Sequence, residues 1–517
     1  MMKNLFTLLA ILMALASFAQ VSGEFTYAND GAILDIEQQG GDEVDFLYSC
    51  GLIYESSFPN GAINKTDVSG TLQWSLVLGE PDFSQFRDIE VLSDGNIIAV
   101  GQTTEDGEEK GIIAQLNEDG EVLSMKSIDF NGTVHLNAVH QKSNGNLLIL
   151  GQNNYDGILF EIDNTGQILQ SKKIGTDERE TFYNFTADDE ENIILVGAYS
   201  DSNFEEEEGL VVKLNENLEL QWSKLIYREI SSTEAPVVVK DCEFNGSNTN
   251  LILQVPGDDS QNIQSRTFDI GVVELNGNGE ITLENTIDLG YWEWPEDLEL
   301  SESGNIILTC RNYPFTIADR FESFVLELND ELGFTSANRY ARDANDLVFF
   351  SSTVINDEFN FVATGGQGQN GSYRMYQTHN VIGVDNCLAS AIQGTSYDPE
   401  FNIEDIFMEI SDLEPEFSDL DYVMNEINDD LNLVCSEFLS SENLTDKGNV
   451  GIYPNPCHYS FQIGGLEDKT PLRILNVLGE EFLKTSYQSG KISVDEWPKG
   501  MYLVEVNGKK TFRLIKN

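Results

Sequence analysis

A short phrase recurs about every fifty residues along this chain, and it constrains the fold more than any other feature. An Asn, often preceded by Gly, is followed by a run of apolar residues. The Asn falls at positions 96, 146, 192, 250, 305 and 360, in steps of 50, 46, 58, 55 and 55 residues. A seventh, related segment is Asp45–Gly51. A repeat period of this length indicates an architecture built from stacked copies of one supersecondary unit.

Each copy predicts four short strands joined by tight turns. In one copy we expect strands over residues 86–92, 97–100, 111–116 and 122–128. Asp-Gly pairs between these runs favour hairpin turns, because Gly adopts a positive φ at no steric cost. Four strands in about fifty residues make one blade of a β-propeller. An open array of sandwich domains would need nearer to about 100 residues per unit. The fold class is therefore predicted to be all-β, with a seven-bladed β-propeller over residues 20–395.

The first nineteen residues have the pattern of a cleavable signal peptide. Lys3 precedes an apolar run, Leu5–Ala16, and Ser17-Phe18-Ala19 places small residues at the cleavage positions. The apolar run is too short to span a bilayer as a helix, and no later segment is long and apolar enough to do so. We therefore expect an exported chain without a transmembrane segment, with Gln20 as the first mature residue.

The net charge of −59, from 88 acidic and 29 basic residues, narrows the partners. Binding to nucleic acid depends on Lys and Arg that displace counterions from phosphates, so this class of partner is excluded. The same charge disfavours anionic lipid surfaces and favours solubility or cation binding. Six cysteines in an exported chain permit disulfides. We expect a bridge between Cys387 and Cys435, and buried free thiols at Cys50, Cys242 and Cys310.

An acidic connector separates the repeats from a chemically different C-terminal segment. Between Arg374 and Lys447 there are seventeen Asp and Glu residues and no Lys or Arg. Apolar residues interrupt this acidic stretch, which favours partial packing over full disorder. We place the connector at residues 396–448. Beyond it, residues 451–517 hold nine basic and seven acidic residues, and such a break in charge marks a separate module.

Alternating apolar and polar residues predict a small β-sandwich for this last module, at residues 449–517. Its motif residues are Tyr453, Pro454, Asn455, Pro456, Gly479, Gly500 and Tyr502. The module closely resembles the C-terminal sorting domain of proteins exported by the type IX secretion system of Bacteroidetes, and the repeats resemble those of secreted bacterial propellers. The resemblance implies recognition by the type IX machinery, passage through the periplasm, and release or attachment to the outer surface. Cleavage near the start of the module is also implied by the family.

The sequence offers few candidates for catalysis. His135 and His140 are five residues apart on a strand, which separates them on the two faces of a sheet and disfavours a shared metal. No nucleophile elbow, phosphate-binding loop or dinucleotide fingerprint is present in a fitting context. The acidic turns at residues 117–120 and 188–191 lack the spacing of an EF-hand loop. We therefore expect no cofactor, with calcium as an open alternative.

An aromatic cluster is the best sequence candidate for ligand contact. Tyr291, Trp292 and Trp294 lie close together beside Pro295, and aromatic rings stack on flat apolar faces, including those of sugars. Packing between blades is the competing explanation for these rings. The leading hypothesis is an exported, non-catalytic, monomeric propeller that binds a glycan or an extracellular protein. The alternatives are a secreted carbohydrate-active enzyme, a hydrolase or lyase with its site at the propeller mouth, and a purely structural adhesin.

Overall fold

The protein is described by a computed structural model that covers most of the repeats, the acidic segment and part of the C-terminal module. It describes residues 21–39, 46–54, 58–67, 71–79, 83–105, 107–201, 207–230, 233–257, 268–301, 303–312, 322–340, 346–356, 360–367, 374–380, 382, 389–397, 401–413, 415–420, 424–426, 432–438, 451–453, 460–464, 469–476, 481–487, 491–494, 497–498, 500–506 and 510–516. The predicted signal peptide, Cys387 and Pro454-Asn455-Pro456 lie outside these ranges, as does Gly479. The described chain divides into two compact units, Gly23–Cys435 and the C-terminal part that begins at Ser436.

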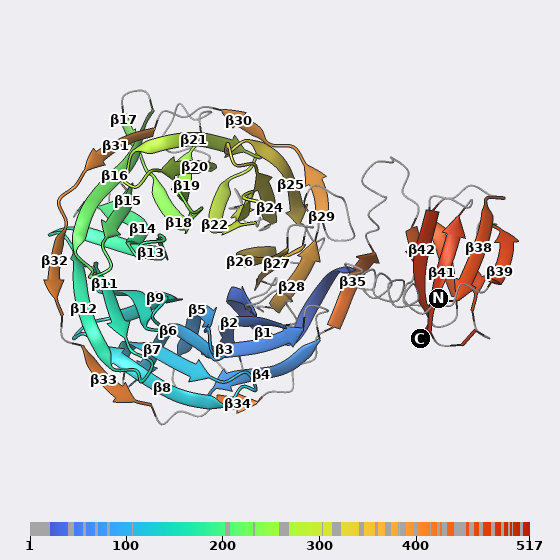
Figure 1. Cartoon of the computed structure of the whole chain (residues 1–517), viewed down its shortest axis with the longest axis horizontal. Coiled ribbons are helices and arrows are strands. Elements are labelled where there is room, and N and C mark those ends of the chain that lie inside the picture. Colours follow the sequence, from blue (N-terminus) through green and yellow to red (C-terminus); the bar gives the residue numbers. More distant parts are fainter. Residues whose placement is uncertain are drawn as a thin grey trace, which may run out of the picture. The chain divides into compact units, whose positions relative to one another are not determined.

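The larger unit is a ring of seven antiparallel blades, which confirms the predicted propeller (Figure 1). Blade 1 contains the second half of β1 (Val21–Gln38), β2 (Phe46–Ile53), β3 (Asn60–Asp67) and β4 (Leu72–Leu78). Blade 2 contains β5 (Ser84–Val91), β6 (Ile97–Glu105), β7 (Glu108–Leu116) and β8 (Val122–Asp129). Blade 3 contains β9 (Val134–Gln141), β10 (Leu147–Asn153), β11 (Asp156–Ile162) and β12 (Ile168–Gly175).

The remaining four blades repeat the same order of strands. Blade 4 contains β13 (Arg179–Ala187), β14 (Ile193–Ser200), β15 (Glu207–Leu214) and β16 (Leu220–Ile230), with the short β17 (Thr233–Ala235). Blade 5 contains β18 (Val238–Phe244), β19 (Thr249–Pro256), β20 (Phe268–Leu275) and β21 (Ile281–Asp288). Blade 6 contains β22 (Glu293–Leu300), β23 (Ile306–Asn312), β24 (Ser323–Leu328) and β25 (Phe334–Tyr340). Blade 7 contains β26 (Asp346–Asn356), β27 (Asn360–Gln367), β28 (Arg374–Asn380) and the first half of β1.

The ring is closed by one strand that belongs to two blades. The first half of β1 pairs with β28, where Gly23 lies opposite His379. Its second half pairs with β2, where Gly31 lies opposite Ile53. The first and last blades are therefore held together by main-chain hydrogen bonds as well as by side chains. Closure of this kind leaves no blade at the end of a row with a face uncovered.

The acidic segment adds one further strand to the outside of each blade, and we call it the strap. Its strands are β29 (Ala389–Ile392), β30 (Thr395–Tyr397), β31 (Phe401–Asp405), β32 (Glu409–Asp412), β33 (Glu416–Asp419), β34 (Met424–Glu426) and β35 (Asn432–Phe438). They pair in turn with β25, β21, β16, β12, β8, β4 and β1, so the strap follows the ring backwards from blade 6 to blade 1 and ends on β1. Figure 1 shows these strands in orange around the rim.

Apolar side chains and ion pairs hold the strap to the ring. The hydrophobic cores lie between neighbouring blades, and Met408, Leu420 and Phe401 of the strap each join one of these cores. Lys172 and Lys224, on outer strands, contact Asp412 and Asp405 of the strap, each with 2.5 Å between nitrogen and oxygen. Both aspartates are largely exposed, so these pairs contribute little free energy and mainly fix the register. The apolar contacts therefore carry most of the attachment.

The C-terminal module consists of two small sheets with a shared core. One sheet contains β36 (Gly451–Tyr453), β37 (Ser460–Gly464) and β40 (Ile492–Ser493). The other contains β38 (Pro471–Asn476), β39 (Glu481–Ser486), β41 (Gly500–Val506) and β42 (Lys510–Lys516). Phe461 and Ile463 of the first sheet pack in one cluster with Ile474 and Val504 of the second. This arrangement confirms the predicted sandwich.

The described part of the chain contains no helix with the length and apolarity needed to span a bilayer. The domain limits at residues 395 and 448 remain predictions. The compact unit Gly23–Cys435 includes most of the segment that the sequence marks as a connector.

Two neighbouring strap residues allow a test of how the strap is attached. Met408 is 2% exposed within the core between blades 3 and 4, whereas Phe407 is 77% exposed. We expect Met408→Ala to lower the free energy of unfolding by about 2–4 kcal/mol, because it removes buried contacts and leaves a cavity. Phe407→Ala should change it by less than about 0.5 kcal/mol. Chemical denaturation of both variants measures the difference, and equal effects would contradict this attachment.

Candidate functional site

The innermost strands carry a recurring pair of carboxylates. An Asp-x-Glu sequence occurs at the same place on the inner strands of blades 1, 2, 5 and 6, at Asp35/Glu37, Asp88/Glu90, Asp241/Glu243 and Asp297/Glu299. In each of these strands the Asp directly follows a β-bulge. A bulge redirects a side chain and increases the local twist. The repeated bulge therefore gives all four aspartates the same orientation.

Each of these four aspartates links its blade to the next one. Asp35 accepts a hydrogen bond from the backbone N–H of Ile89, at 2.9 Å, and Asp241 accepts one from that of Leu298, at 2.8 Å. Asp88 bonds in the same way to blade 3, and Asp297 to blade 7. The Ser351 hydroxyl of blade 7 donates to Asp35 at 2.8 Å, so the chain of contacts also crosses the closure. The aspartates are thus structural ties between blades.

The glutamates lie two residues further along each strand, close enough for the negative charge of the aspartates to act on them. Partial removal from water, followed by the charge of Asp35, raises the pKa of Glu37 to about 8. Removal from water and the charge of Asp241 raise the pKa of Glu243 to about 7. Burial lowers the pKa of His140, but its hydrogen bond with Glu90 outweighs that effect and raises it overall. Within the described residues, His140 is the basic group that contacts one of these four glutamates, Glu90.

These raised values predict a propeller that loses stability as the pH rises. A carboxyl whose pKa is higher in the folded state binds more protons folded than unfolded, so its stabilising effect is present at low pH and is lost as pH rises toward 8. We expect the Tm to be higher at about pH 5.5 than at about pH 8.5. Glu243→Gln should raise the Tm at the higher pH and reduce this difference. Thermal unfolding at both pH values checks this, and an unchanged slope in the variant would count against it.

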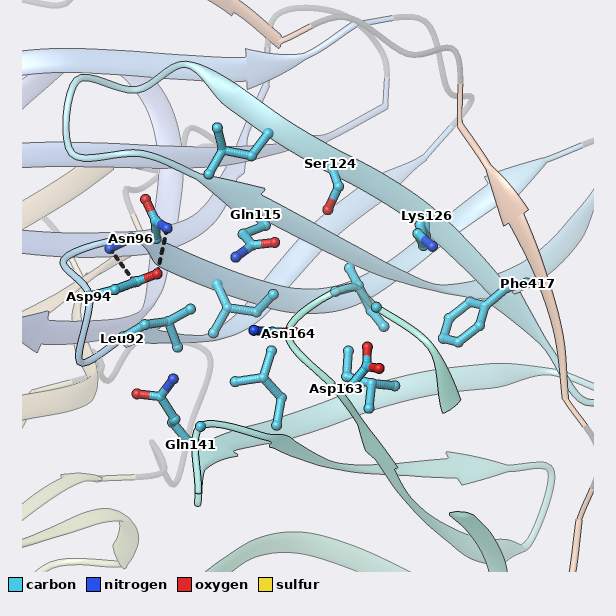
Figure 2. A pocket seen from close by; sticks show the side chains of 17 residues that line it. Leu92, Asp94, Asn96, Gln115, Ser124, Lys126, Gln141, Asp163, Asn164 and Phe417 are labelled. Atoms are coloured by element: carbon cyan, nitrogen blue, oxygen red, sulfur yellow. Dashed lines mark hydrogen bonds between the residues drawn. The ribbon is translucent and has the colours of Figure 1, made fainter. Parts of the chain in front are cut away.

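A separate cavity of about 320 Å³ lies between blades 2 and 3 (Figure 2). It is bounded by the turns that follow β5, β9 and β11 and by strands β7 and β8, and Phe417 of the strap closes one end. Its apolar wall is formed by Leu92, Ile98, Ile113, Leu147 and Ile162. Its polar groups include Asp94, Asn96, Gln115, Ser124, Lys126, Gln141, Asp163 and Asn164. An apolar wall with a few convergent polar groups is typical of a small-molecule site.

At this junction a small residue occupies the position that a Trp takes in two other blades. Trp74 of blade 1 donates its indole N–H to the Glu118 carbonyl at 3.2 Å and packs on the next blade's turn. Trp222 of blade 4 does the same with the Gly277 carbonyl, at 3.1 Å. The register places Ser124 of blade 2 at the equivalent position. No indole fills the gap there, and the space stays open.

Some polar side chains of the cavity already make hydrogen bonds within the protein, and others do not. Asp94 accepts hydrogen bonds from the backbone and side chain of Asn96. Hydrogen bonds from the Thr165 hydroxyl, and then from the Gln167 backbone, lower the pKa of Asp163. By contrast, the side chains of Gln115, Ser124 and Asn164 make no hydrogen bond to any described residue. These three side chains can therefore bind a ligand without breaking an existing contact.

The residues of the predicted aromatic cluster pack in two groups at the start of blade 6. Tyr291 packs against Phe324, with ring centroids 5.0 Å apart, and is partly buried in the core between blades 5 and 6. Trp292 and Trp294 both contact Phe268, with centroids 6.3 Å apart. Lys240 and Arg311 lie over the Trp294 ring, at 5.3 and 5.4 Å. Ligand binding by this cluster stays a prediction.

The other sequence candidates occupy separate places. His135 contacts Glu109 and His140 contacts Glu90, so the two histidines have different partners. The turns at residues 117–120 and 188–191 are held by Asn117 and Asp188, which accept backbone N–H groups within the turn. Cys50, Cys242 and Cys310 are buried free thiols, as expected. The Cys387–Cys435 bridge involves side chains outside the described residues and stays a prediction.

In the C-terminal module, Tyr502 is the predicted motif residue whose surroundings are described in most detail. It is buried on β41, its hydroxyl donates to the Pro498 carbonyl at 2.8 Å, and its ring packs on Trp497 with centroids 5.0 Å apart. Gly500 begins the same strand, and Tyr453 ends β36. Tyr502 is thus part of the core of the module.

The comparisons with known proteins identify this module. Residues 451–517 match the secretion system C-terminal sorting domain. This match confirms the predicted type IX sorting module of a secreted Bacteroidetes protein, with a place outside the cell or on its outer surface. No curated protein sequence matches the chain.

Three solved structures illustrate what the chain is similar to. PorZ, a surface component of the type-IX secretion system of Porphyromonas gingivalis, has 10% identity and a TM-score of 0.41 over 93% of this chain and 59% of PorZ. Sqt1 from Chaetomium thermophilum has 10% identity and a TM-score of 0.35, over 68% of this chain and 87% of Sqt1. Drosophila Semaphorin 1b has 9% identity and a TM-score of 0.35, over 70% and 87%. Likenesses of this size carry no conclusion about function.

Proposed function

We propose that this chain is an exported, non-catalytic propeller that binds a glycan in the cavity between blades 2 and 3. The observation that carries the proposal is the cavity beside Ser124, at a position where two other blades carry a Trp, together with its lining of polar side chains that have no hydrogen bond to a described residue. Gln115, Ser124 and Asn164 offer hydroxyl and amide groups, which match the paired donors and acceptors of sugar hydroxyls. The aliphatic wall suits the apolar faces of sugar rings.

The carboxylates of this cavity favour binding over hydrolysis. A glycosidase needs one carboxyl with a raised pKa as general acid and a second at a defined separation. The pKa of Asp163 is instead lowered by hydrogen bonds, so this group remains ionised. Asp94 is held by Asn96 in its own turn. Neither side chain therefore suits the role of general acid.

A secreted carbohydrate-active enzyme is the second candidate, and the inner strands supply the observation in its favour. Glu37 and Glu243 have raised pKa values near neutrality, which suits a general acid or base. Their neighbouring aspartates, however, are hydrogen-bonded to adjacent blades and act as structural ties. An enzyme at this place would release sugars from a polysaccharide, and its activity would be lost in Glu37→Gln or Glu243→Gln.

The binding proposal is tested by refilling the cavity. Ser124→Trp restores the residue found at the junctions after blades 1 and 4, so the variant should fold normally and lose glycan binding by at least about tenfold. Gln115→Ala should weaken binding by about five- to tenfold through loss of one hydrogen bond. Gln167→Ala, at the end of the turn that follows β11 but not itself in the cavity lining, is the matched control and should bind as the native chain does.

Binding is measured on an array of bacterial, algal and plant polysaccharides, followed by calorimetry with each hit. Reducing-sugar release is assayed in parallel. The proposal fails if Ser124→Trp binds every hit as the native chain does, or if sugar release depends on one of the glutamates.

The sorting module makes a separate prediction about delivery. Removal of residues 451–517 should leave the propeller folded, because that module has its own core, but should stop release from the cell. Fractionation of cells that produce the shortened chain should find it in the periplasm. Equal amounts of the shortened and full chains outside the cell would show that the module is not needed for export.

A further inference from the structure

Three carboxylates converge at the junction between blades 5 and 6, away from the cavity described above. Asp269 begins the third strand of blade 5, Asp288 ends its fourth strand, and Glu293 begins the first strand of blade 6. One oxygen from each lies within 4.8 Å of the other two. Asp269 and Glu293 are 3% and 0% exposed, and Asp288 is partly exposed.

The hydrogen bonds of Glu293 satisfy only one of its two carboxylate oxygens within the described residues. Its Oε1 accepts the backbone N–H groups of Leu289 and Tyr291, at 3.0 and 2.9 Å, so the loop from blade 5 wraps around the carboxylate. Its Oε2 is fully buried and makes no hydrogen bond within the described residues. The buried Thr286 hydroxyl, two residues before Asp288 on the same face of β21, is also without a hydrogen bond there. Buried polar atoms without partners are costly and rare, and a bound ion is one way to satisfy them.

The junction between blades 3 and 4 provides an internal comparison. The strand registers place Asp156, Gly175 and Glu180 there at the positions of Asp269, Asp288 and Glu293. A side chain added at Gly175 would meet the Asp156 and Glu180 carboxylates, so these two acids flank that position.

At that junction a lysine lies beside the two acids. Lys173 contacts Asp156, with 2.7 Å between Nζ and Oδ2. In blade 5 the position of Lys173 is taken by Thr286, and the position of Gly175 by a third carboxylate. The junction between blades 5 and 6 thus has a hydroxyl and a third carboxylate at the two positions where the junction between blades 3 and 4 has a lysine and a glycine.

We propose that Asp269, Asp288 and Glu293 bind a divalent cation, Ca²⁺, at the position that the Lys173 ammonium serves in blades 3 and 4. Ca²⁺ takes six to eight oxygen ligands in flexible geometry and accepts water in the remaining positions, which suits a site with one partly exposed carboxylate. No His or Cys belongs to the group, so the donor set is all oxygen and disfavours zinc. The Glu293 Oε2 atom gains its missing partner in the ion.

The cation would also brace the strap. The Tyr397 hydroxyl of β30 donates to Asp269 at 2.5 Å, and the Thr395 hydroxyl donates to the Asp288 carbonyl at 3.4 Å. Arg228 lies on the other side of Tyr397 and donates to its hydroxyl at 3.4 Å. An ion held by Asp269 and Asp288 thus fixes two residues that hold β30 in place, and it joins blade 5, blade 6 and the strap.

Calorimetry and thermal unfolding of the full chain with CaCl₂, after treatment with a chelator, test the site. The solution contains about 150 mM NaCl, which suppresses loose binding to the acidic surface. We expect one Ca²⁺ site, and a Tm raised by about 3 °C at a hundredfold excess over Kd. Asp288→Gly recreates the Gly175 position and should abolish both effects. Glu180→Gln, which alters the equivalent acid beside Lys173, should leave Ca²⁺ binding unchanged.

Thr286→Lys is a second test that does not depend on removing an acid. It recreates the Lys173 arrangement, so the variant should fold without Ca²⁺ and no longer respond to it. The proposal is overturned if the native chain shows neither heat nor a Tm shift at about 10 mM CaCl₂, a concentration that saturates even weak extracellular sites. It is equally overturned if Asp288→Gly or Thr286→Lys binds Ca²⁺ as the native chain does.

Discussion

The pairing of β1 with both β28 and β2 is the constraint on which the rest of the structure depends. A blade of four strands buries its faces only against neighbours, so seven blades in a row would leave two blades half exposed. One strand shared by the first and last blades removes both exposed ends. Asp35, Asp88, Asp241 and Asp297 then hold four of the inner strands to the next blade by hydrogen bonds from backbone N–H groups.

The strap solves a different problem, at the outer rim. The outermost strand of every blade would offer unpaired N–H and C=O groups to other molecules. Strands β29–β35 occupy these edges one after another, and Met408 and Leu420 fill gaps between blades. The acidic composition of the strap leaves a charged rim, which disfavours edge-to-edge association by like-charge repulsion. This provides a structural role for a stretch whose composition alone suggests a linker.

The sequence predicts the ring well because its period and its Asn-Gly and Asp-Gly turns are local signals. The seven blades and the C-terminal sandwich follow from them. The strap is not predicted as a set of strands, because its segments are short and pair with strands hundreds of residues away, and pairing partners leave no local pattern. The Asp-x-Glu repeat at Asp35, Asp88, Asp241 and Asp297 is present in the sequence, and alignment of the copies would have found it. The cavity required the same alignment, since Ser124 is informative only beside Trp74 and Trp222. The convergence of Asp269, Asp288 and Glu293 depends on three-dimensional proximity.

The direction of the strap has a consequence for how the molecule assembles. Strands β29–β34 of the strap pair with blades 6, 5, 4, 3, 2 and 1 in that order. Each of them can form only after the outer strand of its blade is in place. The contacts of the strap join residues far apart in the sequence, and such topologies fold slowly. The outer edges of the blades therefore stay unpaired for some time during folding, and the strap can pair along its whole length only when all of these blades have formed.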